Sequence, residues 1–270
     1  MNRKALSAPY LFWITAFIVI PLGMVLYYGL TDKTGAFTLE NIIAIATAEH
    51  SKALWIAIKF SLESTVICLL LAYPLAMILA GMQISQHSFI VFIFILPMWM
   101  NFLLRTLAWQ TLLEKSGVIN NILGFLHLPA LNIINTPAAI ILGMVYNFLP
   151  FMVLPIYNSL TKIDPNVINA ARDLGANSVQ TFARITLPLS LPGVISGITM
   201  VFVPALTTFV ISTLLGGSKI LLIGNVIEQE FTQAGNWHLG SGLSIVLMLF
   251  ILINMILTAI FDKDGEGNAV

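Results

Sequence analysis

The stretch "DPNVINAARDLGANSVQTFARITLPLSLPG", residues 164–193, is a polar segment in a chain that is 58% hydrophobic and 9% charged. Asp164 followed by Pro165 is typical of a helix start, because the carboxylate accepts hydrogen bonds from free amides and proline fits the first helical position. Apolar residues then recur at helical spacing: Val167, Ala170, Ala171 and Leu174. The segment is therefore predicted to begin with an amphipathic helix that lies outside the lipid.

Two further signals shape the rest of this stretch. Gly175 is typical of a helix stop, because glycine adopts the left-handed backbone conformation at low cost. Asn177 and Ser178 can cap a second short helix, which is predicted to end at Pro188. The apolar positions of this second helix are Val179, Phe182 and Ala183.

The composition of the whole chain indicates an integral membrane protein. The chain has 270 residues, with 12 Lys and Arg residues against 12 Asp and Glu residues. Soluble domains contain about 25% charged residues, far more than the 9% found here. The balanced charge and the lack of a basic run argue against nucleic acid as a partner. A single cysteine, Cys68, excludes a disulfide framework and a cysteine metal site.

Apolar stretches of membrane-spanning length divide the chain. A helix needs about 20 apolar residues to cross about 30 Å of hydrocarbon. Six stretches meet this criterion: 9–30, 53–82, 88–113, 137–160, 187–215 and 239–261. Backbone polar groups in lipid must bond within their own segment, so all six are expected to be helices. The predicted fold class is all-α integral membrane, with residues 1–270 as one transmembrane domain and a polar loop at 161–187.

Lys and Arg residues near the span ends predict the orientation of the chain. If both termini are cytoplasmic, six basic residues flank the spans on that side: Arg3, Lys4, Lys162, Arg172, Arg184 and Lys263. Four basic residues then lie on the other side: Lys33, Lys52, Lys115 and Lys219. The excess predicts a multi-pass protein of the inner or plasma membrane with the 161–187 loop in the cytoplasm.

The amphipathic helix in this loop has two interpretations. A helix that lies on the membrane surface normally has Lys or Arg on its polar face and bulky anchors below. Here the apolar stripe contains Ala170 and Ala171, which give lipid little to hold but allow another protein to approach the backbone closely. We therefore favour docking into a groove of a partner protein over binding to the membrane surface.

The segment "NAARDLGANSVQTFARITLPLSLPGV" resembles the EAA signature of permease subunits of ATP-binding-cassette (ABC) importers. The matching residues are Ala170, Ala171, Gly175, Phe182, Ile185, Leu187 and Pro188. Asn169 departs from the pattern, because the family usually has glutamate there. The resemblance implies a type I ABC importer permease fold with six transmembrane helices, in which this loop is a cytoplasmic coupling helix that sits in a cleft of the ATPase subunit.

This resemblance also assigns roles to residues and partners. It implies that the ATPase-coupling residues are Asp164, Asn169, Ala170, Ala171, Arg172, Asp173, Leu174, Gly175 and Phe182. It implies a non-catalytic subunit with no cofactor of its own, since ATP–Mg binds to separate ATPase subunits. The sequence agrees with that division of labour, because "GGSK" at 216–219 lacks the spacing of a phosphate-binding G-x-x-x-x-G-K-[ST] loop.

Three further segments resemble permeases of the PotB type, which carry spermidine and putrescine. They are "PMWMNFLLRTLAW" (97–109), "VYNFLPFMVLPIY" (145–157) and "LLGGSKILLIGNVIEQEF" (214–231). The resemblance implies import of polyamines together with a second, PotC-like permease subunit, a pair of PotA-like ATPase subunits and an extracellular or periplasmic PotD-like binding protein. Import of another small solute by the same kind of permease stays open as an alternative.

Charged residues inside the spans are costly in lipid and need partners. Glu63 and Arg105 lie at similar depth on neighbouring spans, so we expect them to form an ion pair, with Lys59 one turn from Glu63. The pair is either a fixed brace between helices or part of the route of a cationic substrate. Candidate residues of that route, which would meet ammonium groups through carboxylates and aromatic faces, are Glu63, Trp99, Arg105, Tyr146 and Glu228.

Two rival classes fit the sequence less well. An intramembrane serine protease needs a base beside its serine, and no histidine lies within a predicted span. The histidines fall in loops or at span ends, and the sequence has no H-E-x-x-H motif that would predict a metal site. An ion-coupled secondary transporter is typically built from inverted repeats with ionisable groups near the membrane midplane, and it has no need of a docking loop.

Overall fold

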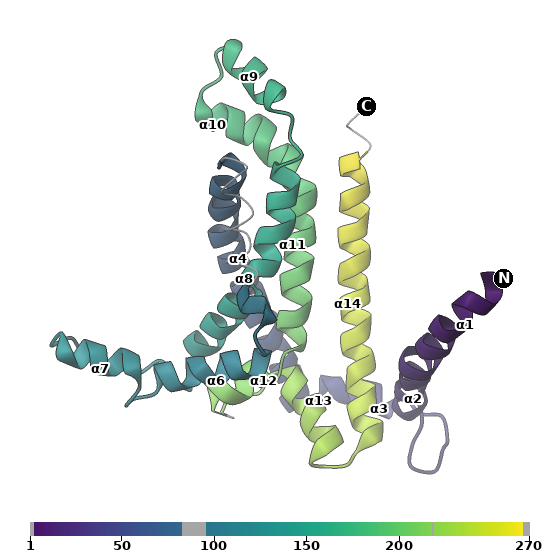
Figure 1. Ribbon diagram of the computed structural model, residues 1–270. Coiled ribbons are helices and arrows are strands. Elements are labelled where there is room, and N and C mark those ends of the chain that lie inside the picture. The colour runs from purple at the N-terminus through teal and green to yellow at the C-terminus, as the bar shows by residue number, and fades with distance from the viewer. Residues whose placement is uncertain (1–2, 83–95, 218, 267–270) are drawn as a thin grey trace.

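The computed structural model describes residues 3–82, 96–217 and 219–266, and its regular elements are helices (Figure 1). Five helical stretches are long and apolar enough to cross a membrane: Pro9–Gly29, Ala48–Gly81, Pro137–Leu160, Ser178–Thr207 and Trp237–Ile256. The prediction of an all-α membrane protein is therefore confirmed. The expected span 88–113 is only partly described, because residues 88–95 lie outside the described ranges.

The core of the bundle is formed by α4 (Ala48–Gly81), α8 (Pro137–Leu160) and α11 (Leu187–Thr207), which pack against one another. Glycines permit the close approach of α11 to α8. A Cβ atom added at Gly193 would lie 2.5 Å from the carbonyl oxygen of Pro155, and one at Gly197 would lie 2.7 Å from the sulfur of Met152. Small residues at such a crossing allow two membrane helices to pack through van der Waals contact.

Short helices lie at the two ends of this bundle (Figure 1). One end, called the α9 end, has α9 (Pro165–Asp173) and α10 (Ser178–Thr181). The opposite end, called the α13 end, has α3 (Glu40–Ile43), α6 (Phe102–Leu113), α7 (Val118–Phe125), α12 (Val210–Gly216) and α13 (Ile223–Thr232). The last helix, α14 (Trp237–Glu266), starts at the α13 end and packs on α11 and α13.

The N-terminal helix leans away from the bundle. It consists of α1 (Arg3–Ile14), the π-turn η1 (Thr15–Val19) and α2 (Ile20–Gly29), and only α2 packs on α14 (Figure 1). At that junction Nδ1 of His238 lies 3.0 Å from the carbonyl oxygen of Tyr28 and 2.7 Å from that of Thr31. The most apolar window of Pro9–Gly29 has no buried residue, so lipid or another chain must cover this surface.

The predicted end of the second short helix at Pro188 is wrong. Ser178–Thr207 is one continuous helical stretch, in which the π-turn η4 (Phe182–Thr186) joins α10 to α11. The amide of Leu187 bonds to the carbonyl of Phe182, five residues back, which widens the helix directly before the proline. A π-turn tolerates proline, because the wider ladder relieves the clash between the ring and the preceding turn. The π-turn before Pro21 has the same arrangement.

The predicted span 187–215 is also corrected by the structure. Helix α11 stops at Thr207, Thr208 is extended with ψ of 139°, and α12 begins at Val210. The expected span 53–82 begins earlier, at Ala48. Helix α6, the described part of the expected span 88–113, runs across the foot of the bundle beside α12 instead of standing upright (Figure 1).

Candidate functional site

The polar stretch after α8 is closed at both ends by the caps that the sequence predicts. Asp164 Oδ1 accepts a hydrogen bond from the amide of Asn166 at 2.9 Å, and Pro165 is the first helical residue of α9. Gly175 has φ of +85°, and its amide donates to the carbonyl of Arg172 at 2.9 Å. The amide of Ala176 donates to Ala171 at 3.0 Å, which completes a Schellman motif.

The second helix of the stretch starts with a capping box. Asn177 Oδ1 accepts from the amide of Gln180 at 2.9 Å, and Gln180 Oε1 accepts from the amide of Asn177 at 3.0 Å. These reciprocal bonds pair two amides that a helix start leaves free. The helix that begins here continues through η4 into α11. The cap therefore fixes the start of a whole membrane span at the α9 end, and not only the start of a short surface helix.

Large apolar side chains protrude from this stretch without cover from the described chain. Leu174 is 90% exposed, Val179 is 74% exposed and Val167 is 44% exposed. Asn169, Ala170, Arg172 and Asp173 are also exposed, whereas Ala171 is half-buried. The predicted stripe is therefore split, because Ala171 turns partly inward while its neighbours face outward. An apolar surface of this kind at the end of a polar segment is typical of a protein–protein contact.

Phe182 faces inward and anchors the stretch to the bundle. Its ring packs edge-on against Tyr73 of α4, with 5.6 Å between the ring centroids. The hydroxyl of Tyr73 in turn lies 2.7 Å from Oγ of Ser190 in α11. Below α9 is a cavity of about 850 Å³, which Phe182, Arg172 and Tyr157 help to line. Phe182 thus connects the polar stretch to two core helices.

The expected ion pair between Glu63 and Arg105 does not form. Among the described residues the structure has one ion pair, Lys59 with Glu63 at 3.8 Å, and both of its side chains are partly exposed. Arg105 is buried, and its Nε donates to Oδ1 of Asn147 at 2.7 Å. The pairing prediction assumed an upright helix beside α4, whereas α6 crosses the foot of the bundle and packs on α8 and α12.

The other predicted route residues lie in separate surroundings. The guanidinium carbon of Arg105 is 5.8 Å from the ring centroid of Tyr146, and the Tyr146 ring also packs edge-on against Trp109. Trp99 is 78% exposed in the short turn before α6. Glu228 lies on α13, where its carboxylate accepts from the hydroxyl of Thr232 at 2.9 Å. The structure therefore brings Arg105 and Tyr146 together and gives Glu63 and Glu228 other neighbours.

Asn225 is an organising residue that the sequence analysis missed. Its Oδ1 accepts from Oγ of Ser212 at 2.5 Å and from the amide of Leu222 at 3.1 Å. Its Nδ2 donates to the carbonyl of Phe209 at 3.1 Å and to the hydroxyl of Thr213 at 2.8 Å. These bonds join α13 to α12 and to Phe209, which lies in the break between α11 and α12. The sequence did carry a signal, since an amide among apolar residues needs buried partners.

Comparison with solved structures shows the fold. The chain is similar to a chain of the bacterial alginate ABC transporter, solved with its pentasaccharide-bound periplasmic protein, with a TM-score of 0.78 over 94% of this chain and 91% of that chain at 16% identity. It is also similar to a chain of the inward-facing MetNI methionine ABC transporter, with a TM-score of 0.58 over 80% of this chain and 95% of that chain at 18% identity.

Sequence comparisons show the family. The chain is 37% identical to the spermidine/putrescine transport system permease protein PotB of Haemophilus influenzae, over 89% of this chain and 87% of that protein. It is 36% identical to PotB of Escherichia coli, over 94% of this chain and 97% of that protein. Residues 3–264 match the family described as binding-protein-dependent transport system inner membrane component. The chain therefore belongs to this family of membrane-spanning permease subunits.

Proposed function

We propose that this chain is the permease subunit of an ABC importer that carries spermidine and putrescine across the cell membrane. The observation that carries the proposal is the similarity along almost the whole chain, at 36% and 37% identity, to two proteins that bear this name. The chain itself supplies the membrane passage. Hydrolysis of ATP–Mg belongs to separate ATPase subunits, and this chain binds no cofactor.

We propose further that the exposed face of α9 and α10 docks on the ATPase. Burying a leucine or valine side chain contributes about 1.5–3 kcal/mol, and Leu174 and Val179 are available for such burial. Ala170 is small enough to let the partner approach α9 closely. The exposed Asn169, Arg172 and Asp173 supply polar contacts around these side chains.

The continuous helix Ser178–Thr207 supports a mechanical role for this docking site. Its 30 residues extend about 45 Å from the docked surface to the break at Thr208. A helix without interruption transmits a displacement along its axis, whereas a flexible loop absorbs it. We infer that closure of the ATPase pair on ATP moves α10, and that α11 carries this movement to the α13 end. The docked surface must then make different contacts in the two states of the transporter.

The proposed assembly follows from these roles. Two permease chains, this one and a PotC-like subunit, surround one pathway, with a pair of PotA-like ATPase subunits at the α9 end. A PotD-like binding protein delivers polyamine at the α13 end. We place the α9 end and both termini in the cytoplasm of a cell whose inner or plasma membrane holds the complex, since this orientation follows the excess of Lys and Arg.

Uptake measurements test the proposed substrate. A strain that lacks its own polyamine importers, supplied with this chain and its partner subunits, is expected to take up labelled spermidine and putrescine. The same strain without this chain is the control and should show only background uptake. Normal growth of the strain with no polyamine uptake above background would contradict the proposed substrate.

A charge placed on the docking surface tests the proposed contact with the ATPase. Leu174→Glu should abolish co-purification with the ATPase, because a carboxylate buried in the contact lacks a partner. Leu126→Glu is the matched control, since Leu126 is 56% exposed but follows α7 at the other end of the bundle. Equal recovery of ATPase with both variants would show that the contact lies elsewhere.

A further inference from the structure

The break between α11 and α12 places the C-terminal end of a long helix inside the protein. Thr208 and Phe209 are not helical, so α11 ends at Thr207 without a following turn to continue its hydrogen-bond ladder. Gly224 of α13 lies close to this helix end, because a Cβ atom added there would lie 2.7 Å from the Thr207 carbonyl oxygen and 3.0 Å from that of Thr208. An irregular backbone at membrane depth is tolerated where it is buried in protein or lines a cavity.

The Thr207 carbonyl group lies at the negative end of a long helix. Peptide dipoles add up to about half a negative charge at a helix C-terminus, and this favours cations within the last turn. In secondary transporters with discontinuous helices, unwound carbonyl groups and helix C-termini coordinate the coupling cation, which shows that such a helix end can hold a positive charge. The end of α11 therefore has the electrostatic character of a cation site.

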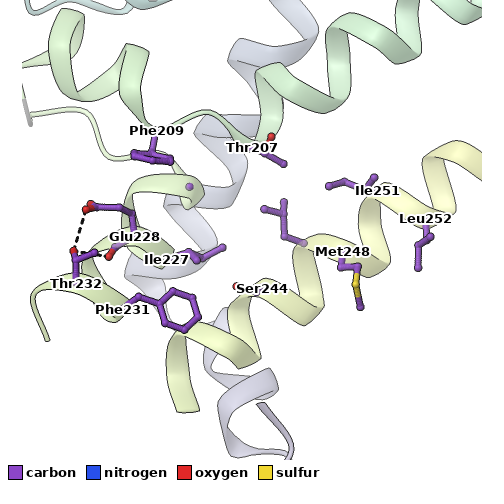
Figure 2. A pocket seen from close by; sticks show the side chains of 12 residues that line it. Thr207, Phe209, Ile227, Glu228, Phe231, Thr232, Ser244, Met248, Ile251 and Leu252 are labelled. Atoms are coloured by element: carbon purple, nitrogen blue, oxygen red, sulfur yellow. Dashed lines mark hydrogen bonds between the residues drawn. The ribbon is translucent and has the colours of Figure 1, made fainter. Parts of the chain in front are cut away.

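A cavity of about 530 Å³ opens at this helix end, between α13 and α14 (Figure 2). Thr207, Phe209 and Gly224 line it at the break, and Phe231 points into the space between the two helices. Its remaining walls are mainly apolar: Ile227, Leu247, Met248, Ile251 and Leu252. Small-molecule sites in proteins typically have about 300–1,000 Å³ and apolar walls with few polar groups.

Glu228 gives this cavity a negative charge. It is the one ionisable residue among those that line the cavity, and no basic residue lines it. The hydroxyl of Thr232 donates to the Glu228 carboxylate and so orients it, as Figure 2 shows beside Phe209. A carboxylate, the negative end of a helix and two aromatic rings surround one apolar space, and all three attract an alkylammonium ion.

We propose that this cavity, at the break after α11, is a binding site for the alkylammonium chain of the transported polyamine. An ammonium group would lie near Glu228 and the end of α11 at Thr207, and the methylene chain would lie along Phe231 and the α14 wall. The inference rests on the proposed function and deepens it. It also gives the continuous α10–α11 helix a role in transport. Displacement of α11 by the ATPase would move the helix end at Thr207 and so change the affinity of the site for polyamine.

Removal of the Glu228 charge tests the site. The whole complex, with both permease subunits, ATPase and binding protein, is reconstituted in liposomes, and initial uptake of labelled spermidine is measured. Glu228→Gln keeps an acceptor for Thr232 and should lower uptake about tenfold, the effect of one lost charged contact, while the complex still assembles. Glu230→Gln is the matched control, because Glu230 is on the same helix but lines another cavity with Lys52 and Lys219.

Filling the cavity is an independent test that needs no change of charge. Met248→Trp should lower uptake by a similar factor, whereas Leu249→Trp should not, since Leu249 is 49% exposed and does not line the cavity. If Met248→Trp blocks uptake but Glu228→Gln transports normally, the cavity holds an uncharged occupant such as a lipid chain, and the inference is wrong. A wild-type complex that moves no spermidine would overturn the proposed function as well, so the two failures are distinguishable.

Discussion

Asn225 uses all of its side-chain hydrogen-bonding capacity to join α13 to the segment that follows α11. The structure records four bonds, from Ser212 and Leu222 and to Phe209 and Thr213. At about 0.5–1.5 kcal/mol for each bond, Asn225→Leu should lower the free energy of unfolding by about 2–6 kcal/mol. Chemical denaturation of the chain in mixed micelles measures this loss. Gln233→Ala, at an exposed position after α13, should stay within about 0.5 kcal/mol of wild type.

Asp32 closes the turn after α2 with three bonds to one carboxylate oxygen. They come from the amide and hydroxyl of Thr34, at 2.8 and 2.7 Å, and from the amide of Ala36, at 3.0 Å. These bonds, that from the Thr34 hydroxyl foremost, lower the pKa of Asp32 below its ordinary value. A carboxyl with a lowered pKa stabilises the turn above its unfolded pKa, and this contribution is lost as pH falls through the folded value.

The carboxyl carbon shift of Asp32, followed by NMR through a pH titration, measures that pKa directly. Thr34→Ala removes the hydroxyl donor and should move the Asp32 pKa back toward its ordinary value. Thr38→Ala is the control, since the hydroxyl of Thr38 accepts from Glu40 and does not contact Asp32. A pKa of Asp32 that is the same in wild type and Thr34→Ala would contradict this account.

At the scale of elements, Gly175 decides whether α9 stops where the docking surface needs it to stop. With φ of +85° and an amide that donates to Arg172, this position excludes proline, which requires φ near about −65° and has no N–H. Gly175→Pro should therefore abolish uptake but leave membrane insertion intact, because the spans are unchanged. Gly175→Asn is the control, since asparagine tolerates the left-handed conformation and should keep most of the uptake. Normal transport by Gly175→Pro would count against a role for this loop in coupling.

At the scale of the whole molecule, the two ends of the bundle should be on opposite sides of the membrane. The native Cys68 is fully buried, so it should not react with a membrane-impermeant maleimide. In intact cells Leu126→Cys, at the α13 end, should be labelled, while Lys162→Cys, an exposed position at the α9 end outside the docking surface, should be labelled only after the membrane is opened. Labelling of Lys162→Cys in intact cells would reverse the proposed orientation.

The local signals in the sequence predicted much of the candidate coupling site. The cap at Asp164, the left-handed stop at Gly175 and the cap at Asn177 all form as predicted. Each depends on bonds between residues a few positions apart, so a short window of sequence contains both partners. Pro188 was misread for the opposite reason. Its effect depends on whether the preceding turn widens, and packing of η4 and α11 against the bundle decides that.

The partners of the charged and polar residues inside the spans needed the tertiary structure. Arg105 meets Asn147 and not Glu63, because α6 crosses the foot of the bundle, and no property of residues 102–113 by themselves specifies that direction. The same holds for Asn225, whose partners lie between three and sixteen positions away, on both sides of the helix break.

Apolar length, capping residues and glycine placement determined, from the sequence by itself, that this chain is a bundle of membrane helices with one protruding polar stretch. These features follow from solvation and from local backbone geometry, which act within a segment. The tertiary structure alone decided where α11 breaks, which cavity forms beside that break and which polar side chains meet there. Those outcomes depend on contacts between helices that are distant in sequence. In lipid, close packing and hydrogen bonds drive such contacts, and neither leaves a hydrophobic pattern that can be read from the sequence.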